Sequence, residues 1–152
     1  VQPRPPPTSA PVPRPPESKA DLDMADAENA LEAMTDFRMA ETALQRSDLV
    51  TAERLAKKAA LADPDQPEYG ALLALILAMS GRSGVVEESI KKLNAILKED
   101  STCETALLYR GKLFKRADKK TEALRDFEAV LEVNPKNREA ATEVRLLRSK
   151  KK

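Results

Sequence analysis

The side chains that could perform chemistry are few, and their spacing offers no catalytic arrangement. The sequence has no histidine, the commonest general acid–base and metal-ligating side chain. Its single cysteine, Cys103, falls at a predicted helix start, where a thiol can be reactive, although such a residue is more often a small packing side chain. One cysteine is too few for a zinc site, and no phosphate-binding loop or nucleophile elbow occurs. Carboxylate pairs such as Glu87 and Glu88 are expected on solvated helix faces. We therefore predict no enzymatic activity, no metal site and no cofactor.

The remaining chemistry is that of charge. The 152 residues include 26 basic and 25 acidic side chains, a net charge of +1, which does not indicate a nucleic-acid-binding protein as a whole. Cations nevertheless gather at Lys112, Lys115 and Arg116, followed by Lys119 and Lys120. Such a group can bind acidic side chains of a partner, provided that the fold brings it onto one surface.

Residues 103–137 contain the clearest structural pattern, two amphipathic helices in succession. The spacing of apolar residues predicts helices from Glu104 to about Ala117 and from Lys119 to Val133. Gly111 falls in the middle of the first helix, where glycine costs about 1 kcal/mol against alanine, so we expect another helix to approach closely there. Asn134-Pro135 ends the second helix. The prediction is an antiparallel helical hairpin.

This hairpin resembles the tetratricopeptide repeat, a unit of about 34 residues. The resemblance departs from the family at Arg110, where an aliphatic residue is usual, and at Val130, where alanine is usual. It implies an all-α fold of antiparallel hairpins stacked as a short right-handed superhelix, and a role in protein–protein interaction. The positions that carry it follow the order large, small, aromatic, small, aromatic, proline: Leu107, Gly111, Phe114, Ala123, Phe127 and Pro135.

The rest of the chain supplies the periodicity. We expect units at about 33–66, 67–103 and 104–137, the middle one lengthened to 37 residues in the Gly81–Gly84 loop. Ser101 stands where the other units have Pro64 and Pro135, and Ser101 and Glu104 fit a capping box. The nearly apolar helix that ends at Met79 is expected to be the most buried. Residues 21–47 form one long helix or two in tandem, with any break near Ala33 to Asp36.

The ends of the chain differ from the repeats, which we expect to occupy 20–149. Residues 1–19 hold eight of the eleven prolines and are predicted to be a disordered linker, either a spacer or a ligand for a proline-recognising domain. Residues 138–149 form a capping helix, followed by a basic tail at 150–152. A proline-rich tether before a repeat array resembles the C-terminal part of larger, bacterial multidomain proteins. It implies a cytoplasmic adaptor, and the lone cysteine fits a reducing compartment.

In the tetratricopeptide family, the first helix of each hairpin lines a concave groove that holds a peptide or a partner helix. We expect its ligand to be a protein or peptide with apolar anchors and acidic residues, because the middle of the groove is apolar and one end is basic. The alternative is that the apolar members simply pack between helices and the lysines form a solvated face. Carried over position by position, the partner-binding groove consists of Phe37, Glu41, Gln45, Ala71, Leu75, Met79, Leu108, Lys112, Lys115 and Arg116.

Two further alternatives remain open at this point. The chain can serve as a homo-oligomerisation module, or a basic surface at 112–120 and 150–152 can contact nucleic acid or anionic lipid. A membrane span is not expected, because no apolar run approaches 18 residues. Chaperone-binding family members grip a peptide's terminal carboxylate with Lys, Asn and Arg, whereas the matching positions here include Phe37, Glu41 and Leu72. A carboxylate clamp is therefore not expected.

Overall fold

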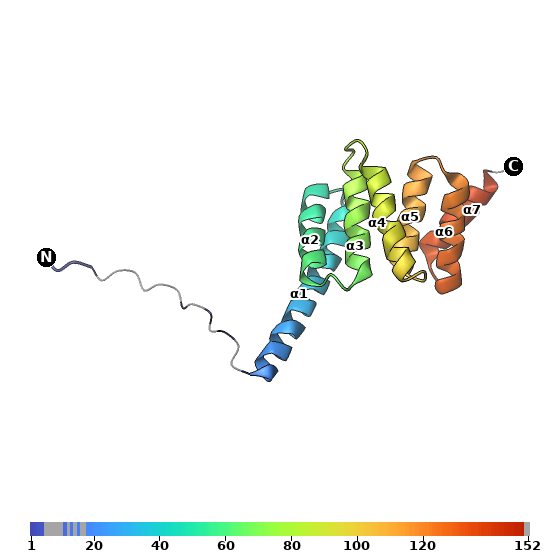
Figure 1. The fold of residues 1–152 in the computed structure, drawn as a ribbon. Coiled ribbons are helices and arrows are strands. Elements are labelled where there is room, and N and C mark those ends of the chain that lie inside the picture. The colour runs from blue at the N-terminus through green and yellow to red at the C-terminus, as the bar shows by residue number, and fades with distance from the viewer. Residues whose placement is uncertain (5–10, 12, 14, 16–17, 151–152) are drawn as a thin grey trace.

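The computed structural model describes residues 1–4, 11, 13, 15 and 18–150, and its regular secondary structure there is entirely α-helical (Figure 1). This confirms the predicted fold class. The described residues before Ser18 are exposed and in no helix or strand, while most of the predicted proline-rich linker and the end of the basic tail lie outside the described residues. The helices are α1 (Lys19–Gln45), α2 (Leu49–Ala62), α3 (Pro67–Met79), α4 (Val85–Glu99), α5 (Glu104–Arg116), α6 (Lys120–Val133) and α7 (Arg138–Ser149).

The helices pack as three antiparallel hairpins, α1–α2, α3–α4 and α5–α6, with α7 against α6 at the end of the array (Figure 1). The first helices of successive hairpins are also neighbours, since α3 contacts both α1 and α5. They therefore form one continuous side of the array. α3 carries more buried residues than any other helix, as predicted from its apolar sequence.

The turn that follows the second helix of each hairpin occurs three times with the same geometry. It starts at Asp63, Asp100 and Asn134, whose φ angles lie between −141° and −134°. In each turn the fourth residue's N–H donates to the first residue's carbonyl, at 3.1–3.3 Å. Ser101 takes the second position, which Pro64 and its counterpart fill in the other turns. The shared backbone geometry shows that these segments are structural equivalents.

The predicted capping box at the start of α5 is wrong. The helix begins at Glu104 with Cys103 as its N-cap, and no side chain caps it. Instead, the backbone N–H of Thr102 donates to Asp100 Oδ1 at 3.0 Å. This local aspartate turn holds Ser101 outside the helix, so its hydroxyl cannot serve as the cap.

The capping helix α7 is joined to the last hairpin by a side-chain network. Asn137 caps it by accepting a hydrogen bond from the Ala140 N–H at 2.9 Å. The side-chain amides of Asn134 and Asn137 both donate to Glu104 Oε1, at 2.9 and 2.7 Å. Because Leu147 is also buried, α7 is fixed by packing along its length and by hydrogen bonds at its start.

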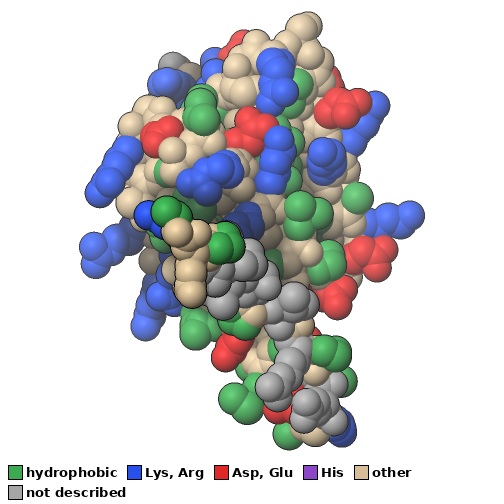
Figure 2. Space-filling view, turned by 90° about the vertical axis from the view of Figure 1, so that its left-hand side faces the viewer, with side chains coloured by type: hydrophobic (Ala, Val, Ile, Leu, Met, Phe, Trp, Pro, Cys, Tyr) green, Lys and Arg blue, Asp and Glu red, His purple; other side chains and the backbone are tan. Residues whose placement is uncertain are grey.

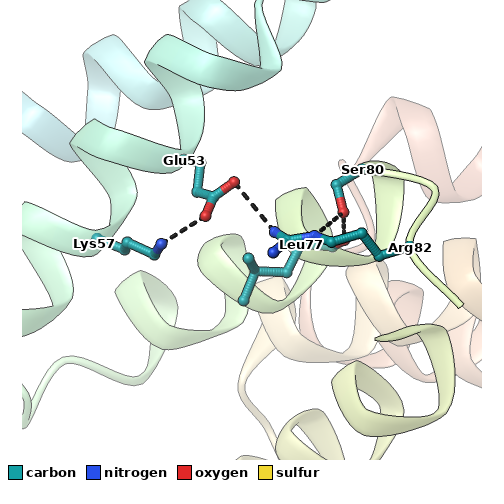
Figure 3. Close-up of polar contacts among 5 residues, drawn as sticks. All are labelled: Glu53, Lys57, Leu77, Ser80 and Arg82. Carbon is teal, nitrogen blue, oxygen red and sulfur yellow. Dashed lines mark hydrogen bonds and ion pairs between the residues drawn. The ribbon is translucent and has the colours of Figure 1, made fainter. Parts of the chain in front are cut away.

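The α3–α4 loop is longer than the other two hairpin turns, and it is anchored on a neighbouring hairpin. Arg82 Nη2 lies 3.4 Å from Glu53 on α2, and Arg82 Nε donates to Ser80 Oγ at 3.1 Å (Figure 3). Glu53 also pairs with Lys57 at 2.5 Å. The hydrogen bond from Lys57 is the main reason that the pKa of Glu53 lies below its usual value. The extra loop residues are thus held against the array.

α1 is one continuous helix, so the chain has no break between Ala33 and Asp36. All its buried residues lie in the C-terminal part: Ala33, Asp36, Ala40 and Ala43. The N-terminal half extends away from the bundle (Figure 1).

Ion pairs mark the point where α1 leaves the bundle. Lys58 on α2 pairs with Glu32 and with Asp36, the latter at 3.1 Å. Hydrogen bonds to these two carboxylates, the one to Glu32 first, raise the pKa of Lys58 above its usual value. These pairs link the two helices at the edge of their contact.

The last hairpin depends on a close contact at Gly111. A β-carbon at this position would lie 2.8 Å from Cε1 of Phe127, whose ring is fully buried. The expected close approach of another helix is therefore confirmed. Arg110, which departs from the family pattern, has a structural role: its Nε and Nη2 donate to Asp126 at 2.8 and 2.7 Å, and its Nη1 donates to Asn94. It joins α4, α5 and α6.

We predict that Gly111→Ala destabilises the chain by about 1–3 kcal/mol, because the new methyl group overpacks against a ring that cannot move into solvent. The free energy of unfolding from urea denaturation measures this effect. Gly70→Ala is the matched control, since Ile96 Cδ1 would lie 3.7 Å from the new β-carbon, an ordinary contact. At position 70 the higher helix propensity of alanine should raise the free energy of unfolding by up to about 1 kcal/mol. Equal effects of the two substitutions would contradict this account.

Candidate groove on the first-helix face

A hollow of about 500 Å³ opens where α1, α3, α5 and α7 meet. Its walls come from the C-terminal ends of α1, α3 and α5 and from the middle of α7, which packing of the first helices brings together. The lining residues are Leu44, Gln45, Leu75, Met79, Lys112, Leu113, Lys115, Arg116 and Glu143.

The base of the hollow is apolar. Leu75 and Leu113 are almost fully buried and belong to the hydrophobic core, whereas Leu44 and Met79 are half-buried. The unbranched thioether of Met79 can adjust to different ligand shapes. The base of the hollow can therefore bind apolar side chains of a partner.

The rim of the hollow is charged, and α7 supplies carboxylates that the sequence prediction did not include. Lys112 Nζ lies 2.6 Å from Glu139, and Lys115 Nζ lies 2.6 Å from Glu143. Arg116 is exposed and has no ion pair among the residues that the structure describes. The predicted basic end of the groove is thus partly neutralised, while its lining residues still carry three cations against one carboxylate.

The other predicted groove residues lie outside the hollow. The ring of Phe37 is half-buried against Tyr69, with centroids 5.0 Å apart. Glu41 accepts a hydrogen bond from the Tyr109 hydroxyl at 3.4 Å. Leu108 is half-buried, and Ala71 is fully buried, so Ala71 offers a partner no contact area.

Tyr109 contacts both Glu41, which lies outside the hollow, and Lys112, which lies on its rim. Burial raises the pKa of its phenol well above the usual range, so the hydroxyl stays neutral and donates to Glu41. Lys112 Nζ also lies 5.5 Å from the centroid of its ring. Leu113, Glu139 and Glu143 were absent from the predicted groove. Repeating the 34-residue spacing from α5 onto α7 would have pointed to Glu139.

The groups considered for catalysis lie apart from the hollow. Cys103 is buried, and burial raises the pKa of its thiol, which disfavours the reactive thiolate. Glu87 and Glu88 are exposed on α4. Within 18–150 and the described residues before it, no group of three or more potential metal-ligating side chains occurs. None of the described helices is both long and apolar enough to span a membrane.

No family model and no curated protein sequence matches the chain, but solved structures do. The first domain of Spaghetti (RPAP3), bound to the HSP90 peptide SRMEEVD, has a TM-score of 0.60 and 22% identity over 79% of this chain and 93% of that one. The second domain of human RPAP3, in complex with the HSP70 peptide SGPTIEEVD, has a TM-score of 0.57 and 21% identity over 81% and 98%. The Sgt2 domain from Aspergillus fumigatus has a TM-score of 0.62 and 16% identity over 78% of each chain.

These structures are all tetratricopeptide-repeat domains. The chain therefore has the tetratricopeptide-repeat fold, as the resemblance in its sequence implied. In that fold the hollow lies on the side formed by the first helices of the hairpins.

We predict that Cys103 reacts slowly with a thiol reagent such as DTNB in the folded chain, at least about tenfold more slowly than in denaturant. The physical reason is its burial and the raised pKa of its thiol. The absorbance of the released product gives both rates. A native rate equal to the denatured rate would show an accessible, reactive thiol.

Proposed function

We propose that the chain is a protein–protein interaction module whose groove binds a peptide or helix of a partner protein and that it performs no catalysis. The observation that carries this proposal is the hollow itself, which combines an apolar base with a net positive rim. An occupant with one or two apolar anchors and nearby carboxylates complements both features.

The neighbouring structures support this ligand class. The peptides bound by the two RPAP3 domains, SRMEEVD and SGPTIEEVD, each combine apolar side chains with several carboxylates. The present chain lacks the lysine and asparagine residues of the carboxylate clamp at Phe37, Glu41 and Leu72. We therefore propose recognition of acidic and apolar side chains, without capture of the peptide's terminal carboxylate.

The carboxylates of α7 are compatible with such binding. The Lys112–Glu139 and Lys115–Glu143 pairs lie at a partly exposed rim, where an ion pair contributes about 0–1 kcal/mol. A ligand carboxylate can therefore replace Glu139 at small cost, because the Glu139 side chain is about half exposed and stays hydrated when displaced. Arg116 can bind a ligand carboxylate without first releasing a glutamate.

The proposal also covers the domain organisation of the chain and its cellular location. The three equivalent turns support units at 33–66, 67–103 and 104–137 with a capping helix at 138–149. A cytoplasmic adaptor within a larger, bacterial protein is consistent with the lone Cys103 and with the proline-rich composition of residues 1–19.

We predict that peptides selected on the chain from a random displayed library contain apolar residues together with Asp or Glu. Lys115→Glu combined with Arg116→Glu should weaken their binding by about tenfold or more, because it reverses the charge of the rim. Fluorescence anisotropy with the selected peptides gives the affinities, and added salt should weaken binding to the wild type.

Lys91→Glu combined with Lys98→Glu is the matched control, since it makes the same charge change at exposed positions on α4. This variant should bind as the wild type does. The proposal fails if the two variants lose affinity equally, or if the selected peptides lack acidic residues.

A further inference from the structure

From the projecting half of α1 to the point where the helix joins the bundle, an apolar stripe faces solvent. Its residues recur at spacings of four and three, which places them on one side of the helix. Met24 is 64% exposed and Leu31 is 61% exposed, and the core-facing residues Ala33 and Ala40 lie on the opposite side of the same helix. The stripe consists of Ala20, Met24, Ala27, Leu31 and Met34, all exposed.

Acidic residues surround this stripe. Residues 19–32 contain Lys19 as their only base and five acids, a local net charge of −4. Figure 2 shows hydrophobic and acidic side chains on the part that projects below the bundle, and many Lys and Arg side chains over the bundle itself. The acidic side chains are Asp21, Asp23, Asp26, Glu28 and Glu32.

We propose that the stripe of one copy of the chain docks into the hollow of a second copy. This inference rests on the proposed function of the groove and names its occupant. An acidic helix with the apolar anchors Met24 and Leu31 has the chemistry that the rim and base of the hollow complement. The anchors are two helical turns apart, about 10 Å along the helix axis.

The occupant must come from another copy because of the geometry of α1. The helix is continuous, and Leu44 and Gln45 at its C-terminal end line the same hollow. Its N-terminal half points away from the bundle (Figure 1). An unbroken helix cannot fold back, so the stripe of one chain cannot reach its own groove.

Charge favours the groove over pairing between two stripes. Two copies of residues 19–32 would bring ten carboxylates together with only two lysines, an unfavourable arrangement. In the groove, Asp23 and Glu28, which flank the stripe, can approach the rim cations Lys115 and Arg116. Their carboxylates then take the part that Glu143 plays in the isolated chain.

The test is sedimentation velocity of the full chain over a wide concentration range. The contact joins different surfaces of the two copies, so each added copy leaves a free groove and a free stripe. The average mass of the wild type should therefore rise with concentration and exceed that of a dimer, unless the copies close into a ring. Met24→Glu with Leu31→Glu, the stripe variant, should remain monomeric. Lys115→Glu with Arg116→Glu, the rim variant, should also remain monomeric. Leu22→Glu, at an exposed position outside the stripe, is the matched control and should associate like the wild type.

Mixing the two variants gives the decisive result. The stripe variant keeps an intact groove and the rim variant keeps an intact stripe, so an equimolar mixture should form a complex of one copy of each. All the substituted residues are exposed, and circular dichroism verifies that the variants fold.

Several outcomes overturn the proposal. One is a wild-type chain that stays monomeric at every concentration. Another is association that both the stripe variant and the rim variant retain. A third is a rim variant that associates by itself, which indicates pairing of two α1 helices. A monomeric wild type whose selected peptides still bind in a rim-dependent manner rejects this inference and leaves the proposed function standing. Loss of rim-dependent peptide binding rejects both.

Discussion

The close approach of α5 and α6 at Gly111 is the constraint on which the candidate site depends. A residue without a side chain fits against the buried ring of Phe127, whereas a β-carbon there would force the ring or the helices to shift. Arg110 strengthens the contact through its two hydrogen bonds to Asp126. With α5 fixed on this side, the residues that follow Gly111 along the helix are held facing α3 and α7. The hollow is therefore set by the packing behind it.

Much of this architecture follows from local sequence. Apolar spacing predicted the helices at 104–117, 119–133 and 138–149 to within a residue of their ends, because each has a periodic face that must be buried. Prolines and glycines located the turns, and the equivalence of Ser101 with Pro64 and Pro135 followed from spacing alone. The need for a close contact at Gly111 was also predictable, since glycine within a helix requires a reason.

The features that escaped prediction depend on tertiary context. The expected capping box failed because Asp100 accepts from the Thr102 N–H in a local turn, and the helix begins only at Glu104. Whether α1 breaks was undecidable from its pattern, since its N-terminal half has no packing partner within the described bundle. The repeat spacing could have pointed to Glu139, but the ion pairs of Lys112 and Lys115 with glutamates depend on how α7 packs against the last hairpin. Charge counted along the sequence therefore overstated how basic the groove is.

The central claim is that the hollow binds acidic segments with apolar anchors. The most direct measurement is the NMR amide shifts of the labelled stripe variant, whose own α1 anchors are removed, as a selected peptide is added. We expect the shifts to concentrate at the C-terminal ends of α3 and α5 and near Glu143 on α7. Shifts concentrated on α2 and α4, with no change at Met79 or at 112–116, would contradict the account.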